Sequence, residues 1–276
     1  MRECRRQWSS RGPRRHSGGP EGGVAVNSAS EQGVQRAIES IYRNVGEQIT
    51  IEDMARTAMF SKFHFTRLFQ RATGVSPGRF LSAVRLQEAK KLLLSTSLSV
   101  TDISHRVGYN SVGTFSSRFK RSVGLSPTAY RELGGFAPQI HTDGQRYGAR
   151  TAVVHGQVSN RPDDMEEGPV FMGLFPDTIP QGSPVRCTVL ERPGSFRLED
   201  VPEGSWHLLV QSVRPGDEEI IGTRPPTVAT HGPIRIRPGA VAGPLEMWLR
   251  PMRALDPPIL LALLDARRVA LSGAAS

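Results

Sequence analysis

Cysteine is scarce in this chain, and long apolar runs are absent. Only Cys4 and Cys187 occur in 276 residues, which excludes a disulfide framework and a cysteine-rich zinc site. The longest aliphatic run, Ile259–Leu264, is far shorter than the roughly 20 residues that a membrane-spanning helix needs. Met1–Ser17 is basic, but no apolar segment follows it, so we expect no secretory signal peptide. These absences favour a protein of the reducing cytoplasm without contact to a membrane.

Acidic residues are too few to balance the basic ones, and the imbalance is uneven. The chain has 35 Lys and Arg against 26 Asp and Glu, a net charge of +9. Residues 1–30 carry +4, residues 31–133 carry +7 and residues 134–276 carry −2. This asymmetry predicts two modules with different roles, and the basic module suits a polyanionic partner. Residues 1–30 have almost no apolar side chains, which predicts a disordered basic tail.

An internal repeat organises the basic module. Ile51–Met54 matches Val100–Ile103 at an offset of 49 residues, and Ser61–Arg71 matches Ser111–Arg121 at an offset of 50. The one inserted residue falls where we expect a turn, and insertions cost least there. Repeats should be sought before local structure is assigned, and here each copy reads as a helix, a short turn and a second helix.

Each copy also carries signals for where its helices begin. Thr50-x-x-Asp53 and Ser99-x-x-Asp102 are capping boxes ahead of the first helices. Gly108 suits a left-handed helix exit, and Ser61 and Ser111 are candidate N-caps of the second helices. A longer helix from Pro77 to about Ser95 is expected to join the copies.

The second helix of a helix-turn-helix leaves its outer face free for the major groove of DNA. The expected outer faces carry cationic and hydrogen-bonding side chains. They are Lys62, His64, Thr66, Arg67 and Arg71 in copy one, and Val112, Gly113, Thr114, Ser116, Ser117, Lys120 and Arg121 in copy two, beside the N-cap Ser111. Arginine can pair bidentately with guanine, and Val112 suits a thymine methyl group. Arg71, Lys120 and Arg121 at the helix ends suit phosphates.

A single basic helix-loop-helix is more often a solvated surface than a DNA reader. Two copies with matching caps, matching aromatic positions and a shared positive charge favour DNA strongly. The connecting helix of about 19 residues would be roughly 28 Å long, and successive major grooves on one face of DNA lie about 34 Å apart. One chain could therefore occupy two adjacent grooves.

These residues resemble the signature of the AraC/XylS transcription regulators. The resemblance rests on Val107-Gly108-Tyr109-Asn110-Ser111, on Phe115-Ser116-x-Arg118-Phe119-Lys120-Arg121 and on Gly124-Leu125-Ser126-Pro127-x-x-Tyr130-Arg131. It covers roughly residues 35–133 and implies two recognition helices in adjacent major grooves near a promoter. By resemblance, base contacts fall on Phe63, Thr66 and Arg67, and on Val112, Gly113, Ser116 and Ser117. From the residues alone, Phe63 has two readings, the core or the groove, and His64 can be a DNA ligand or a solvated side chain.

One departure from the family bears on how the two copies share the work. Many members have a basic residue where this chain has Ser117. We therefore expect copy one to dominate specificity.

The composition changes at Gly134, where proline and glycine become frequent and helical periodicity ends. Residues 134–149 are expected to form a linker, residues 150–252 an antiparallel β-sandwich and residues 253–276 a tail with a short helix at Ile259–Ala270. The expected strands are Thr151–Val158, Val170–Phe175, Val185–Leu190, Phe196–Leu198, Trp206–Val213, Ile234–Arg237 and Leu245–Arg250. Phe196–Leu208 is similar to a hairpin of the carboxypeptidase-regulatory-like, transthyretin-like sandwiches.

Catalytic signals are missing from the β-rich region. His155, His207 and His231 are widely spaced, and none forms a compact ligand motif with Asp, Glu or Cys. No nucleophile elbow, Walker loop or dinucleotide fingerprint occurs. We therefore expect no catalytic residues, no cofactor, no metal and no enzymatic activity.

The sequence as a whole predicts a multidomain chain, an all-α double helix-turn-helix domain at residues 31–133 followed by an all-β domain. The predicted function is sequence-specific transcription regulation, with double-stranded promoter DNA and RNA polymerase as partners. The β-domain is expected to sense a small-molecule effector or to mediate self-association. The alternatives are a nonspecific nucleoid-type DNA binder and an enzyme on the β-domain that the helices target to DNA.

Overall fold

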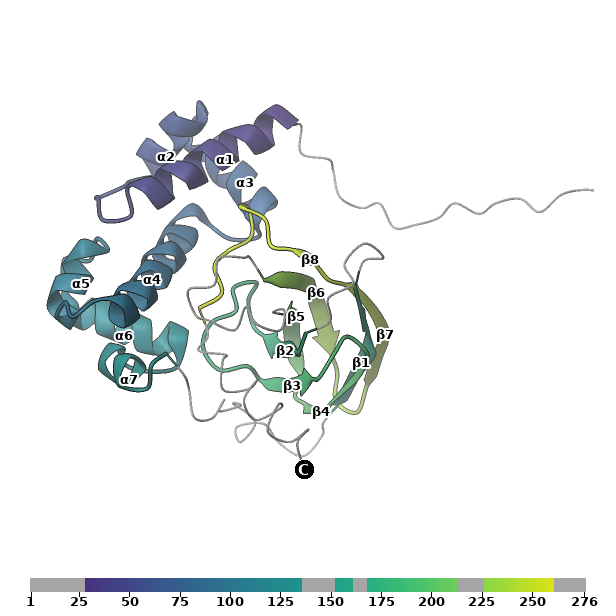
Figure 1. Ribbon diagram of the computed structural model, residues 1–276. Helices are drawn as coiled ribbons and strands as arrows, with labels where there is room; N and C mark the ends of the chain where they lie inside the picture. Colours follow the sequence, from purple (N-terminus) through teal and green to yellow (C-terminus); the bar gives the residue numbers. More distant parts are fainter. Residues whose placement is uncertain (1–27, 136–151, 161–167, 213–225, 261–276) are drawn as a thin grey trace, which may run out of the picture.

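The computed structural model describes residues 28–135, 152–160, 168–212 and 226–260 (Figure 1). Within these residues the helices come first and the strands follow. Helix α1 begins at Ser28, so the helical domain starts three residues before the expected boundary at residue 31. The rest of the expected tail, and nearly all of the expected linker at 134–149, lie outside the described residues.

Seven helices form the first domain among the residues described. They are α1 (Ser28–Arg43), α2 (Ile51–Ala58), α3 (Lys62–Thr73), α4 (Pro77–Ser95), α5 (Val100–Arg106), α6 (Val112–Val123) and α7 (Pro127–Glu132). Figure 1 shows α4 between the group α1–α3 and the group α5–α7. The connecting helix is thus present over the expected residues, and it starts at Pro77, whose fixed backbone angle suits a first helical turn.

Each copy of the repeat contains three buried aromatic rings at equivalent positions. They are Phe65, Phe69 and Phe80 in copy one, and Phe115, Phe119 and Tyr130 in copy two. Neighbouring ring centroids lie 5.4 Å apart in the first set and 5.7 and 5.5 Å apart in the second. Tilted and edge-to-face pairs of this kind add about 0.5–1.5 kcal/mol beyond the burial of their area. The constant offset of 50 residues between the sets confirms the duplication.

The turns of the two copies both need one residue in the left-handed backbone conformation, and they use different residues for it. The chain leaves α2 through Met59 at φ 62° and leaves α5 through Gly108 at φ 82°. Glycine adopts this left-handed conformation at no steric cost, as the sequence indicated for Gly108. Met59 bears the small cost of a non-glycine residue there, and no sequence signal pointed to it.

The capping boxes of the first helices are present with different completeness. The Thr50 side chain accepts from the Asp53 backbone N–H at 3.2 Å, and the Asp53 carboxylate accepts from the Thr50 backbone N–H at 3.0 Å. In copy two, Ser99 accepts from the Asp102 backbone N–H at 3.1 Å, and the Asp102 carboxylate accepts from the Ser99 hydroxyl at 2.6 Å. Both boxes therefore satisfy one free amide of the first turn, and only the first is reciprocal through the backbone.

The caps of the second helices correct one expectation. Ser111 accepts from the Thr114 backbone N–H at 3.4 Å, as an N-cap should. Ser61 holds the N-cap position with extended backbone, but its side chain makes no capping hydrogen bond. The residue type predicted the position in both copies, whereas the rotamer that completes a cap depends on the surrounding chain.

The strands of the second domain form two sheets. They are β1 (Ala152–Ser159), β2 (Val170–Phe175), β3 (Arg186–Leu190), β4 (Ser195–Val201), β5 (Gly204–Ser212), β6 (Thr227–Ile236), β7 (Val241–Trp248) and β8 (Arg250–Pro251). One sheet has the order β4-β1-β7 and the other the order β3-β2-β5-β6-β8. Apolar residues from both sheets, including Val154 and Leu198 of the first and Met172 and Leu208 of the second, share one core.

Two features of the sheets differ from the expectation. β1 pairs with β7 in parallel, whereas the sequence predicted antiparallel pairing throughout. Alternation along a strand predicts which face a side chain occupies, and it carries no information about the direction of the neighbouring strand. β6 begins at Thr227, seven residues before the expected Ile234, because its middle is polar and exposed and gives no alternation.

The end of the described chain also differs from the expectation. Residues 252–260 contain a turn and no helix, so the first two residues of the helix expected at Ile259–Ala270 are not helical. The remainder of that segment lies outside the described residues. In the part of the chain that the structure describes, no helix is long and apolar enough to cross a membrane.

Candidate nucleic-acid interface

Helix α3 buries one face and exposes the other. Phe65, Leu68 and Phe69 are in the core of the helical domain. Phe63, two positions before Phe65, is 80% exposed. This excludes the core for Phe63, because the ring faces solvent on the outer side of the helix, and its contact with the groove stays a prediction.

Helix α6 repeats the arrangement with smaller side chains. Phe115 and Phe119 are buried at the positions equivalent to Phe65 and Phe69. The first turn exposes Gly113 and also Val112, which is 39% exposed. The outer face of α6 near its start is therefore small and uncharged.

All fourteen residues predicted to contact DNA lie on α3, on α6 or at the start of α6, and twelve of them are exposed. The two half-buried ones, Thr66 and Ser116, occupy equivalent positions in the copies. The Thr66 hydroxyl donates to the Lys62 carbonyl at 2.8 Å, so it is engaged within its own helix. The structure thus brings the predicted residues together on two equivalent faces, while their contact with DNA stays a prediction.

Four cations on these faces are available to an anionic partner. Arg67, Arg71, Lys120 and Arg121 are exposed. None of the four makes an ion pair or hydrogen bond with another residue that the structure describes. Unpaired exposed cations can neutralise phosphates without first breaking an internal bond.

Two further side chains of copy one are held in place by neighbours. Lys62 forms an ion pair with Glu52 of α2, and the Lys62 ammonium holds the pKa of the Glu52 carboxyl below its usual range. The His64 ring lies edge-on to Phe60, with centroids 5.2 Å apart. Copy two has Val112 at the position equivalent to Lys62, so it lacks this pair. The start of α3 is thus charged and positioned, whereas the start of α6 is neutral.

The spacing of the two faces follows from α4. This helix has 19 residues, Pro77–Ser95, and at 1.5 Å per residue it is about 28 Å long. The length of α4 is of the same order as the roughly 34 Å between successive major grooves on one face of B-DNA.

Among the described residues, no group of three or more His, Cys, Asp or Glu side chains lies close enough together to hold a metal ion. Burial raises the pKa of the Cys187 thiol, which makes it a poor nucleophile.

The sequence located no site in the β-domain, and the structure contains one candidate there. A pocket is lined by residues from β2, β5 and β6 and from the segments 178–180 and 252–259. Its walls come from parts of the chain that lie far apart in the sequence, so no local sequence motif predicts the pocket.

The comparisons with known proteins concern the helical domain. A family model described as a helix-turn-helix domain matches residues 54–133. The lactose operon transcription activator of Staphylococcus xylosus is 34% identical over 108 residues, which cover 39% of this chain and 38% of that protein. The transcriptional activator AarP of Providencia stuartii is 33% identical over 88 residues, 32% of this chain and 65% of that protein. The chain spans less than two thirds of either relative.

A solved structure matches the same region. It is the C-terminal domain of AraT, a response regulator from Geobacillus stearothermophilus, with 33% identity. The match covers 37% of this chain and 84% of that chain, with a TM-score of 0.36.

Two helix-turn-helix units with exposed second helices, together with the family model and the sequence relatives, define the helical domain as a DNA-binding domain of transcription regulation. The matched residues fall within the region that resembles the AraC/XylS transcription regulators, and the two sequence relatives are transcription activators.

Proposed function

We propose that the chain is a sequence-specific transcription regulator whose helices α3 and α6 enter two adjacent major grooves of promoter DNA. The observation that carries the proposal is the pair of equivalent exposed faces, each with cations that make no ion pair or hydrogen bond with another described residue. A merely solvated helix surface has no reason to repeat this exposure at an offset of 50 residues. RNA polymerase is the further partner expected of a regulator at a promoter.

The two helices divide the work. α3 offers Phe63, His64 and Arg67 in its first two turns, where recognition helices contact base edges. α6 offers Val112 and Gly113 at its start and the cations Lys120 and Arg121 in its last turn. We infer that α3 reads most of the sequence, whereas α6 mainly holds the phosphate backbone and sets the register.

We further propose that the β-domain senses an effector. Two sheets with one shared core support a β-sandwich. The domain contacts the helical domain directly, because the Gly182 backbone N–H donates to the Ser122 carbonyl at 2.8 Å. A domain packed on the DNA reader suits effector sensing, and self-association through its free surfaces is the second candidate role.

The test is selection of bound sites from random double-stranded DNA with the full chain. We expect enrichment of two short sequence elements whose centres lie about 10 base pairs apart, one helical turn. The element read by α3 should be longer and more strictly specified than the element read by α6.

The same experiment separates the rival functions. Strong binding without enrichment, combined with a steep salt dependence, would identify a nonspecific nucleoid-type protein and overturn the proposal. The enzyme alternative has less support, because the relatives of the helical domain are transcription regulators.

A further inference from the structure

One short loop of the β-domain holds the ends of both recognition helices. We define residues 176–182, between β2 and β3, as the bridging loop. The Thr178 hydroxyl donates to the carbonyl of Gly74, the residue that ends α3, at 3.2 Å. The Gly182 backbone N–H donates to the carbonyl of Ser122, in the last turn of α6, at 2.8 Å. Both bonds lie at the opposite ends of the helices from the turns predicted to read bases.

The bridging loop is anchored by burial and charge as well. Ile179 is 1% exposed and belongs to the core of the helical domain. Asp177 forms an ion pair with Arg79 of α4. Leu260 is fully buried in the same core, and its backbone N–H donates to the Pro180 carbonyl at 3.1 Å. The loop therefore links α3, α4 and α6, and a shift of the loop must act on all three.

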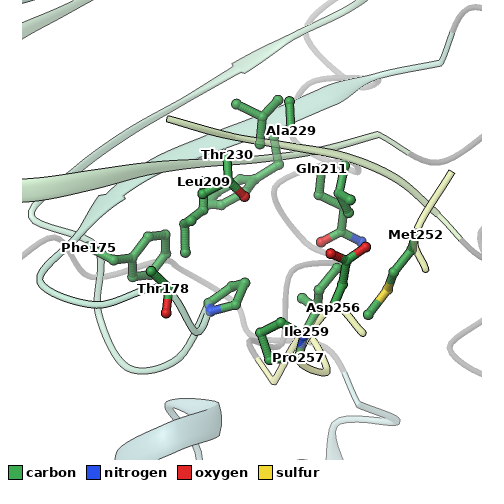
Figure 2. A pocket seen from close by; sticks show the side chains of 14 residues that line it. Phe175, Thr178, Leu209, Gln211, Ala229, Thr230, Met252, Asp256, Pro257 and Ile259 are labelled. Atoms are coloured by element: carbon green, nitrogen blue, oxygen red, sulfur yellow. The ribbon is translucent and has the colours of Figure 1, made fainter. Parts of the chain in front are cut away.

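A pocket lies directly behind the bridging loop. Its cavity volume is about 50 Å³. Phe171, Phe175 and Leu209 form an apolar cluster on the face of the five-stranded sheet away from the main core, and Ile259 packs against it. Thr178 and Pro180 of the bridging loop are part of the wall. Figure 2 shows Phe175 and Thr178 on one side of the empty space, with Gln211, Asp256 and Ile259 across from them.

Gln211 gives this apolar pocket one unpaired hydrogen-bond acceptor. Its side-chain oxygen is buried and has no hydrogen-bond partner among the described residues. Buried polar atoms are almost always paired, so an orphaned acceptor on a pocket wall is a position for a donor from outside the chain, an ordered water or a ligand that displaces it. The nearby Asp256 carboxylate is already engaged, since it accepts from both terminal nitrogens of Arg250 at 2.6 and 2.8 Å. A ligand that fits this wall therefore donates a hydrogen bond to the Gln211 oxygen and is neutral, because Arg250 already pairs with the Asp256 carboxylate.

We propose that this pocket binds a small, neutral, mostly apolar molecule that donates one hydrogen bond to Gln211, and that its binding changes DNA affinity through the bridging loop. The regulatory half rests on the proposed function, whereas the binding half does not. Ligand binding and DNA binding are coupled because Thr178 lines the pocket and also donates a hydrogen bond to the carbonyl at the end of α3. An occupant that moves or fixes Thr178 changes how α3 and α6 are held relative to each other.

The binding half is tested by titration calorimetry on the full chain with two matched pairs of probes. Phenol is compared with toluene and indole with benzofuran, because each pair has nearly the same shape and only the first member donates a hydrogen bond. We expect saturable binding of the donor probes, at least about fivefold tighter than their partners. Gln211→Leu should abolish that difference. Gln87→Leu removes the other orphaned amide oxygen, which lies on α4 outside the pocket, and should leave the difference intact.

Four results would overturn the binding half. The first three are no saturable binding of either donor probe, equal binding within both pairs, and a preference for donors that survives Gln211→Leu. Binding that appears only after removal of residues 261–276 would identify the chain's own end as the occupant and would also overturn it.

The regulatory half is tested with the DNA site obtained by selection. A donor probe should change DNA affinity at least about fivefold, and DNA should change the affinity of the probe by the same factor, since coupling is reciprocal. Thr178→Val removes the bond to Gly74 while keeping the side-chain shape, so it should weaken the coupling and retain probe binding. Probe binding without any effect on DNA affinity would overturn this half. A chain that binds the probes through Gln211 but selects no DNA sequence would refute the proposed function and leave the pocket assignment standing.

Discussion

The two helix-turn-helix copies have the same interior and different exteriors. Their aromatic rings occupy equivalent buried positions, and their second helices both have 12 residues. Outside, copy one presents Phe63, His64 and Arg67, whereas copy two presents Gly113, Thr114 and Ser117 at the equivalent positions. The two units therefore share their packing while their outer surfaces differ, as the proposed role of two readers of different DNA elements requires.

The largest expected effects test the equivalence of the interiors. Phe69→Ala and Phe119→Ala each remove a fully buried ring, so each should lower the free energy of unfolding of the helical domain by about 3–5 kcal/mol. Urea denaturation followed by the helical circular dichroism signal measures this. The exposed Phe63→Ala is the matched control and should cost less than about 0.5 kcal/mol. A large difference between the Phe69 and Phe119 variants would show that the two interiors are not equivalent.

The next prediction tests the difference between the exteriors. Arg67→Ala should cost about 1–3 kcal/mol of binding to the selected site and relax specificity at one base pair. Ser117→Ala at the equivalent position should change affinity much less, because a short hydroxyl offers no bidentate contact. Competition assays against a panel of single-base variants measure both. If Ser117→Ala relaxed specificity as much as Arg67→Ala, the assignment of the main reader to α3 would be wrong.

A pH effect distinguishes copy two from copy one. Lys90 of α4 lies over the ring of Tyr130, with its ammonium 5.9 Å from the centroid. Burial lowers the pKa of Lys90 from 10.5 to about 8. Above pH 8 the folded chain releases this proton while the unfolded chain keeps it, so stability should rise with pH, by about 1–2 kcal/mol up to about pH 9.5.

The matched variant for this effect is Lys90→Met, which keeps the length of the side chain without the charge. It should remove the pH slope, and it also removes the hydrogen bond that the Lys90 ammonium donates to the Ile259 carbonyl at 3.4 Å. Burial raises the pKa of Tyr130, which opposes the trend once unfolded tyrosine ionises, so the scan ends below about pH 10. A flat profile in the wild type between pH 8 and 9.5 would contradict the account.

The sequence predicted the helical domain well because its signals are local. Capping boxes, Pro77 and the repeated aromatic spacing each specify structure within a few residues, and the repeat provided a second, independent instance of every signal. The missed features depend on partners distant in sequence. Met59 adopts its left-handed turn without a glycine, β1 pairs in parallel with β7, and Gln211 and Thr178 meet at a pocket that only the fold assembles.

A smaller effect separates phosphate binding from base reading. Lys120→Ala should weaken binding to all sequences similarly and reduce the slope of log affinity against log salt by roughly one. Arg71→Ala in copy one, at the position equivalent to Arg121, should behave alike. Titrations at several salt concentrations, with selected and unrelated DNA, measure the slopes. A loss confined to the selected sequence would move Lys120 into the base-reading set.

The smallest effect concerns the starts of the two recognition helices. Ser111→Ala removes a side-chain cap and should cost about 0.5–1 kcal/mol of stability. Ser61→Ala should be nearly neutral, because the Ser61 side chain makes no capping hydrogen bond. Thermal unfolding of the two variants side by side measures the difference. Equal costs would mean that both serines cap their helices in solution.

The central claim is that one chain presents two different readers to neighbouring turns of the same duplex. Hydroxyl-radical and methylation footprinting of the full chain on a selected site, at single-nucleotide resolution, tests it most directly. The account predicts two protected tracts on one face of the DNA, centred about 34 Å apart, with guanine protection lost from only one tract in Arg67→Ala. A single tract, or two tracts on opposite faces of the duplex, would contradict it.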